Sequence, residues 1–116
     1  NVNFLGQVKS SYAKQIIANA KILVSPSRNE GLPMVLLEAV SLRTMVVATN
    51  VGGCCEVIDS KYLVENDQFV NHNISRLICY LIDTDIDDYH FKNIVPLEFN
   101  LNDEIEYIDN HLSLRV

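Results

Sequence analysis

The feature that most constrains the fold of this chain is the segment 22–40, ILVSPSRNEGLPMVLLEAV. It opens with a short apolar run that predicts a buried strand at 22–24, and continues through a polar turn. An apolar helix is then predicted to begin at Pro33, since proline suits the first helical position. A strand, a glycine-containing turn and a helix N-terminus form a common α/β arrangement for holding a ligand, and the unpaired amides of the first helical turn attract phosphate. The segment therefore predicts an α/β fold with a ligand site in this turn.

Two glutamates, Glu30 and Glu38, lie in this segment with seven residues between them. The neighbours of Glu38 are apolar on nearly every side of the predicted helix, so the helix is expected to be buried. A buried carboxylate is costly unless it is hydrogen-bonded. Glu38 is therefore expected either to bond nearby backbone or a basic residue, or to accept hydrogen bonds from ligand hydroxyls such as a ribose diol. Glu30 lies at the mouth of the helix, so the two carboxylates could hold two parts of one extended ligand.

The rest of the chain alternates between patterns typical of strands and of helices. Strands are predicted at 2–5, 46–49 and 62–64, and helices near 56–59 and after Asn71. Two further helices are predicted, one with Ser10 or Ser11 as its N-cap and one with Asn102. The helix after Asn71 is expected to carry one apolar stripe, formed by Ile74, Leu77, Ile78, Leu81 and Ile82. Strands alternating with helices predict a parallel sheet that helices cover on both faces.

Composition and charge exclude several classes of protein. A chain of 116 residues, 48% of them hydrophobic, is expected to form a single domain over 1–116 rather than a disordered segment. Residues 1–50 carry five Lys or Arg against two Glu, whereas residues 51–116 carry four against thirteen acids. The acidic half argues against a nucleic-acid-binding surface, and the basic excess lies in the half that would meet a phosphate. No apolar run approaches the ~20 residues of a membrane span, and no signal peptide is visible.

The cysteines and acidic residues do not predict a metal site. Cys54, Cys55 and Cys79 are odd in number, which fits a reducing compartment better than a disulfide framework. No histidine lies near them at zinc-ligand spacing, and the cysteines after Gly53 are expected to be small apolar filler. The Asp-x-Asp pattern at 83–85 lies in an acidic run that is expected to be a solvated loop.

These segments resemble the donor-binding signature of the retaining GT-B glycosyltransferases of the large group 1 family (family 4). The signature combines an apolar strand, Pro-Ser, Glu-Gly, a hydrophobic stretch and a second Glu, matched here by Pro26-Ser27, Glu30-Gly31-Leu32-Pro33 and Leu37-Glu38-Ala39. The flanking matches are Phe4-Leu5-Gly6, Val46-Val47-Ala48-Thr49, and Val51-Gly52-Gly53 followed by Glu56-Val57-Ile58. The resemblance implies a Rossmann-like parallel sheet flanked by helices, corresponding to the C-terminal part of a GT-B donor-binding domain.

The resemblance also implies roles for individual residues. Glu30 would contact hydroxyls of the transferred sugar at the reacting centre and is the catalytic candidate, while Glu38 would bond the ribose. The expected donor-binding set comprises Glu30, Gly31, Leu32, Met34, Val35, Glu38, Gly52 and Gly53. For the glycines, a flexible turn alone is an equally ordinary explanation. The donor would be a UDP- or GDP-hexose, its sugar would pass with retention to a glycan or lipid-linked acceptor, and no cofactor or metal is implied.

Further expectations concern partners and location. The acceptor-binding half of the family, and the Arg and Lys that grip the diphosphate, have no counterpart in this sequence. The chain alone is therefore expected to be inactive, and either to use a separate acceptor-binding half or to self-associate through open sheet edges. The resemblance implies a cytoplasmic location, including peripheral proximity to the inner face of a membrane. The alternative function is a non-catalytic remnant module that binds a nucleotide or a partner.

Overall fold

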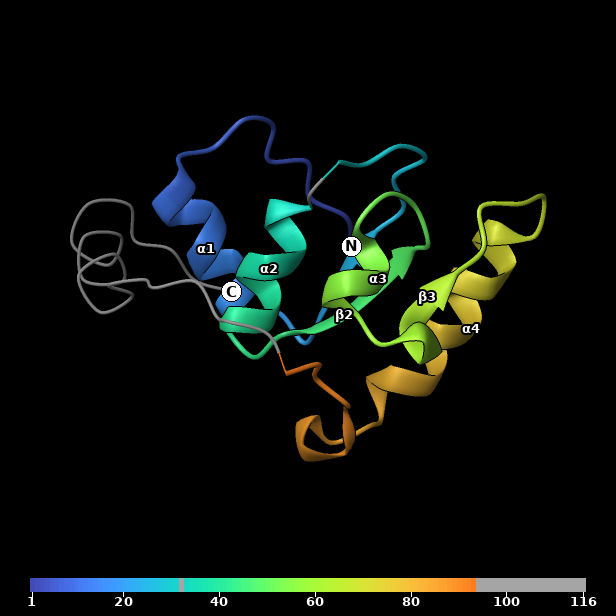
Figure 1. Ribbon diagram of the computed structural model, residues 1–116. Helices are drawn as coiled ribbons and strands as arrows, with labels where there is room; N and C mark the ends of the chain where they lie inside the picture. The colour runs from blue at the N-terminus through green and yellow to red at the C-terminus, as the bar shows by residue number, and fades with distance from the viewer. Residues whose placement is uncertain (32, 94–116) are drawn as a thin grey trace.

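The computed structural model describes residues 1–31 and 33–93 (Figure 1). In chain order the helices and strands are α1 (Ser10–Asn19), β1 (Ile22–Ser25), α2 (Met34–Ser41), β2 (Met45–Thr49), α3 (Cys54–Val57), β3 (Leu63–Val64) and α4 (Val70–Ile82). Short 3-10 turns, η1 and η2, lie at Ser60–Tyr62 and Ile86–Asp88. The helix predicted from Asn102 lies outside the described residues.

The three strands form one parallel sheet in the order β1-β2-β3. β1 and β2 pair from Ile22 with Met45 to Ser25 with Ala48, whereas β3 pairs only with Ala48 and Thr49. Helices α1 and α2 lie on one side of the sheet and α4 on the other (Figure 1). The predicted parallel α/β fold of the Rossmann-like kind is confirmed, and it brings the carboxyl ends of β1 and β2 next to each other.

The core is built around β2, whose five residues are all buried. Valine-rich segments are common in central buried strands, because β-branched side chains pack well on a sheet that is covered on both faces. α2 contributes Leu36, Ala39 and Val40 to the core, and α4 contributes Ile74 and Leu81. The predicted stripe on α4 is wrong at its end: Ile82 is 53% exposed because it lies about 100° around the helix from the buried Leu81.

The strand predicted at 2–5 does not form in the described structure. Residues 1–9 lack regular secondary structure, and Phe4 is 95% exposed. A strand is stable only when its backbone bonds a neighbour, and β1, β2 and β3 pair only with one another. Segment 2–5 therefore has a sequence typical of a strand but no neighbouring strand with which to pair in the described sheet.

Three expectations for α1 and α2 need correction. α2 was expected to be buried on nearly every side, but Met34 and Val35 are exposed because only one face of the helix packs on the core. Pro33 precedes the first helical residue rather than occupying it. At α1 the N-cap is Lys9, without a side-chain capping bond, rather than a serine, since Ser10 is already helical.

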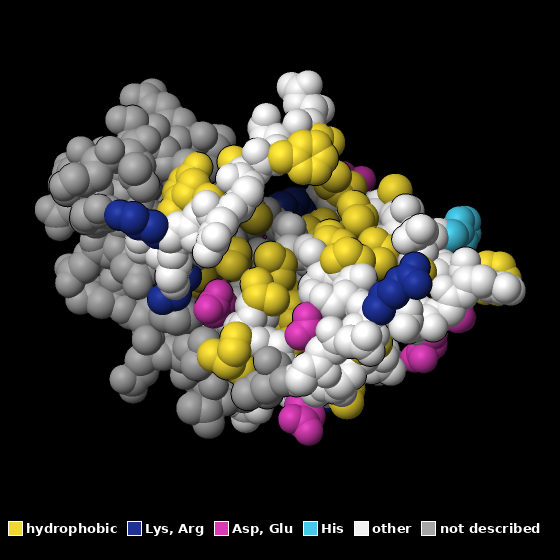
Figure 2. Space-filling view, turned by 90° about the horizontal axis from the view of Figure 1, so that it is seen from above, with side chains coloured by type: hydrophobic (Ala, Val, Ile, Leu, Met, Phe, Trp, Pro, Cys, Tyr) yellow, Lys and Arg dark blue, Asp and Glu magenta, His cyan; other side chains and the backbone are white. Residues whose placement is uncertain are grey.

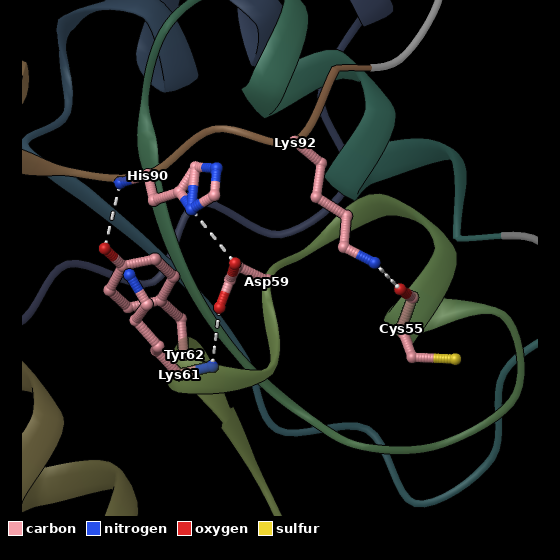
Figure 3. Close-up of polar contacts among 6 residues, drawn as sticks. All are labelled: Cys55, Asp59, Lys61, Tyr62, His90 and Lys92. Carbon is pink, nitrogen blue, oxygen red and sulfur yellow. Dashed lines mark hydrogen bonds and ion pairs between the residues drawn. The ribbon is translucent and has the colours of Figure 1, made fainter.

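The segment 86–92 packs against β2, η1 and the residue that follows α3. The rings of Tyr62 and Tyr89 stack with their centroids 3.9 Å apart, and Phe91 forms a backbone bridge with Ile58. Two polar contacts also hold this segment (Figure 3). Nδ1 of His90 lies 3.1 Å from Oδ2 of Asp59, and the Lys92 ammonium donates to the backbone carbonyl of Cys55. The residues after α4 are thus attached to the α3–η1 region, on the opposite edge of β2 from β1.

Candidate functional site

The turns that follow β1 and β2 meet at the carboxyl ends of these strands. The backbone N–H of Gly53 donates to the carbonyl of Gly31 across 3.1 Å, joining the two turns directly. The turn after β2 is also attached to β3, because the N–H of Asn50 donates to the Val64 carbonyl across 2.7 Å. The predicted glycine loop and the predicted Glu-Gly turn therefore form one continuous backbone surface.

Gly52 makes the close approach of the turns possible. A Cβ atom at this position would lie 1.9 Å from the carbonyl oxygen of Glu30, and the glycine adopts a left-handed φ of 53°. Any other residue would both strain the backbone and push the turns apart. The tight backbone geometry that the sequence permits is therefore present at Gly52, and a ligand beside it stays a prediction.

An open hollow of about 460 Å³ lies between the turns. It is lined by Arg28, Asn29, Glu30, Gly31, Val51 and Gly52. This volume is in the range of small-molecule sites. Figure 2 views the end of the molecule that is uppermost in Figure 1, where hydrophobic side chains alternate with charged ones around hollowed parts of the surface.

Glu30 is half-buried, and its negative charge affects Cys54 in the turn after β2. Burial raises the pKa of the Cys54 thiol above its ordinary value, and the negative charge of Glu30 adds a smaller rise in the same direction. Cys54 is 1% exposed and therefore stays an uncharged, packed thiol, as the sequence predicted. The same prediction is wrong for Cys55, which is exposed because α3 buries Cys54 and Val57 instead. Among the described residues that line the hollow, Glu30 is the acidic one.

The first residues of α2 and Glu38 are not among the described residues that line this hollow. Among the described residues, the N–H groups of Met34 and Val35 have no hydrogen-bond acceptor, as expected at the start of a helix. Glu38 is half-buried in the second turn of α2, and its carboxylate has no hydrogen-bond or ion-pair partner in the described part of the chain. The structure thus supplies neither the backbone cap nor the basic partner that one interpretation of Glu38 required.

The predicted site residues are therefore brought together in part. Glu30, Gly31 and Gly52 line the hollow, and Gly53 joins its walls, whereas Met34, Val35 and Glu38 do not line it. Leu32 lies outside the described residues. Three lining residues, Arg28, Asn29 and Val51, were not predicted. Their position in the two turns can be read from the sequence. Whether the side chain of a turn residue faces the hollow depends on the backbone conformation, which the residue type does not reveal.

The described residues show neither a metal-binding cluster nor a membrane-spanning helix. Across residues 1–31 and 33–93, no cluster of three or more His, Cys, Asp and Glu side chains is arranged to hold a metal ion. The predicted solvated loop is confirmed by the exposure of Asp83 and Asp85. In the same part of the chain, no helix has the length and apolar character needed to cross a membrane.

The fold and the joined turns define a Rossmann-like α/β domain. Residues 1–83 match the family described as "Glycosyl transferases group 1", and the chain belongs to this family. TuaC of Bacillus subtilis, named as a glycosyltransferase of teichuronic acid biosynthesis, is 42% identical over 48 residues, or 41% of this chain. An uncharacterised glycosyltransferase of Methanocaldococcus jannaschii is 31% identical over 94 residues, or 81% of this chain. The alignments span 12% and 23% of these relatives, and no solved structure matches the chain.

Proposed function

We propose that this chain forms the donor-binding portion of a retaining GT-B glycosyltransferase of family 4, which takes a hexose from a UDP- or GDP-sugar. The observation that carries the proposal is the contact between the turns after β1 and β2, where Gly53 donates to Gly31 beside the Glu30 carboxylate. A ligand at the carboxyl ends of parallel strands would meet both turns at once. Family membership supports sugar transfer as the reaction class.

In this proposal the two glutamates hold different parts of the donor. Glu30 contacts hydroxyls of the transferred sugar at the reacting centre, and Glu38 bonds the ribose with the carboxylate that has no partner among the described residues. The amides of Met34 and Val35 face the phosphate end of the donor, where the helix dipole favours negative charge. The protein's contribution is to position the donor and to stabilise charge on the leaving diphosphate.

The acceptor, the partner and the location belong to the same proposal. The name of TuaC supports a polysaccharide or lipid-linked glycan as acceptor. We expect the chain to be inactive alone, with a separate acceptor-binding half or a second copy completing the site. No cofactor or metal is needed for the donor site as proposed. The protein would work in the cytoplasm, near the inner face of a membrane where glycan precursors are assembled.

Calorimetric titration with UDP, GDP and their hexose conjugates tests the proposal. One nucleotide and its sugar conjugate should bind, and Glu38→Ala should weaken that binding about tenfold, or about 1.4 kcal/mol. Asp83→Ala, which removes an exposed carboxylate beyond the end of α4, is the matched control and should leave binding unchanged. Silence for all ligands, in a protein shown to be folded, would contradict the proposal and favour a non-catalytic, partner-binding module.

A further inference from the structure

Among the described residues, the ionisable side chains in the lining of the hollow between the turns are Arg28 and Glu30. Arg28 is exposed, and in the described part of the chain it has neither an ion-pair partner nor a hydrogen-bond acceptor. An arginine stays protonated at any pH at which the protein is folded, so it places a full positive charge at the hollow. That charge is not neutralised by any contact with described residues.

The other described cations are placed elsewhere. Lys61 and Arg76 line a separate hollow between β3 and α4, Arg43 stacks 4.2 Å over the ring of Phe91, and Lys92 donates to a backbone carbonyl of α3. Lys9 is the N-cap of α1, Lys14 lies within that helix, and Lys21 lies between α1 and β1. None of these side chains lines the hollow between the turns. Among the described Lys and Arg residues, Arg28 alone can therefore provide a cationic contact to a ligand bound there.

The two charges select for a ligand that carries both hydroxyl groups and an anionic group. A carboxylate such as Glu30 accepts hydrogen bonds from hydroxyls and repels anions, whereas a guanidinium binds the paired oxygens of a phosphate or carboxylate with two parallel bonds. Glu30 and Arg28 lie two residues apart in one turn, which the bond from Gly53 to Gly31 holds in place. An anionic sugar derivative satisfies both side chains, and a neutral sugar satisfies only one.

We propose that Arg28 binds an oxyanion of the ligand in this hollow, adjacent to the hydroxyls held by Glu30. The inference rests on the proposed function, since it concerns the same donor site, and assigns there a residue that the sequence signature does not include. The oxyanion is either a phosphate of the nucleoside diphosphate or a carboxylate on the sugar, because both present the same pair of oxygens to a guanidinium.

The test is titration of the wild-type chain and of Arg28→Gln and Arg28→Lys with pyrophosphate, UDP, UDP-glucose and UDP-glucuronate. Arg28→Gln should weaken binding about tenfold or more, and Arg28→Lys less, because lysine keeps the charge but loses the paired bonds. Arg76→Gln is the matched control, since it removes an exposed arginine from the separate hollow and should change nothing. Unchanged unfolding midpoints would show that the variants are folded.

The four ligands separate the outcomes. An equal loss for pyrophosphate, UDP and both sugars would assign the contact to the diphosphate, and a loss confined to UDP-glucuronate would assign it to the sugar carboxylate. Unchanged binding of all ligands by Arg28→Gln would overturn the inference and leave the proposed function standing. Wild-type protein that binds pyrophosphate through Arg28 but neither UDP nor GDP would overturn the proposed function alone. Wild-type silence for all four ligands and for GDP would overturn both.

Discussion

The Tyr89 hydroxyl bonds both backbone groups of Val46 in the central strand: it donates to the carbonyl across 2.7 Å and accepts from the N–H across 3.1 Å. β3 pairs only with Ala48 and Thr49, so it does not reach Val46. The tyrosine hydroxyl takes the place of the missing strand backbone. Burial raises the pKa of Tyr89 well above its ordinary value, so the hydroxyl keeps the proton that it donates.

We expect Tyr89→Phe to lower the free energy of unfolding by about 2 kcal/mol, because it leaves two buried backbone groups of Val46 without partners. The ring itself would keep its stacking on Tyr62. Urea unfolding followed by circular dichroism measures the loss. Tyr80→Phe is the control, since Tyr80 is 68% exposed, and should have little effect. Equal stability of the two variants would show that water or other groups replace the hydroxyl.

Substitution of Gly52 should separate the turns that form the candidate site. Gly52→Ala places a Cβ atom against the carbonyl of Glu30 and also strains a left-handed backbone. Gly6→Ala is a matched control, because Gly6 has a similar φ of 65° but nothing lies within 4 Å of its Cβ position. We expect Gly6→Ala to cost about 1 kcal/mol, and Gly52→Ala about 1–3 kcal/mol more from the clash. Similar losses in urea unfolding would mean that the turns move apart freely.

The sequence predicted elements whose signal is local and missed features that depend on distant partners. The strand, turn and helix of 22–40 follow from apolar periodicity and a proline, and the glycine loop from adjacent glycines. The apolar pattern at 2–5 looks equally strand-like, but a strand also needs a neighbour. Tyr89 follows an acidic run, and nothing nearby in the sequence indicates that it bonds Val46, 43 residues earlier. The sequence did not predict that Arg28 lines the hollow, because the orientation of a turn side chain depends on the folded backbone.

The polar contacts of Asp59 predict a loss of stability in acid. Its carboxylate accepts the backbone N–H of Lys61, and this bond, helped by the charges of Lys61, His90 and Lys92, lowers the pKa of Asp59 below its ordinary 3.8 (Figure 3). Because the folded pKa is the lower one, the contribution is complete above the ordinary value and is lost as pH falls through the folded pKa.

Urea unfolding between about pH 5 and pH 2 measures this contribution of Asp59. The unfolding free energy of Asp59→Asn should fall less steeply with acidification than that of the wild type, since an amide does not titrate. Asp87→Asn, a change at an exposed position in η2, should follow the wild-type curve. If Asp59→Asn also follows the wild-type curve, the contacts of Asp59 in Figure 3 do not contribute to acid stability.

The open edges of β1 and β3 and the exposed apolar segment 2–5 offer surfaces through which the chain could self-associate. β1 and β3 each pair only with β2 in the described sheet, and the segment 2–5 exposes Val2 and Phe4 although its sequence favours a strand. We expect an oligomer whose fraction rises with concentration in light scattering. Phe4→Ser should weaken it about tenfold or more, because burying one Phe side chain contributes about 1.5–3 kcal/mol.

The control for self-association is Phe69→Ser, which removes a phenylalanine that is 56% exposed at the start of α4. If the interface uses the N-terminal segment, this variant should associate like the wild type while Phe4→Ser does not. Equal weakening by both variants would indicate non-specific hydrophobic contact, because a defined interface depends on the position of its apolar residues. A monodisperse wild-type monomer over a wide concentration range would rule out association through these edges. The donor site would then have to bind its ligand within a single copy of the chain.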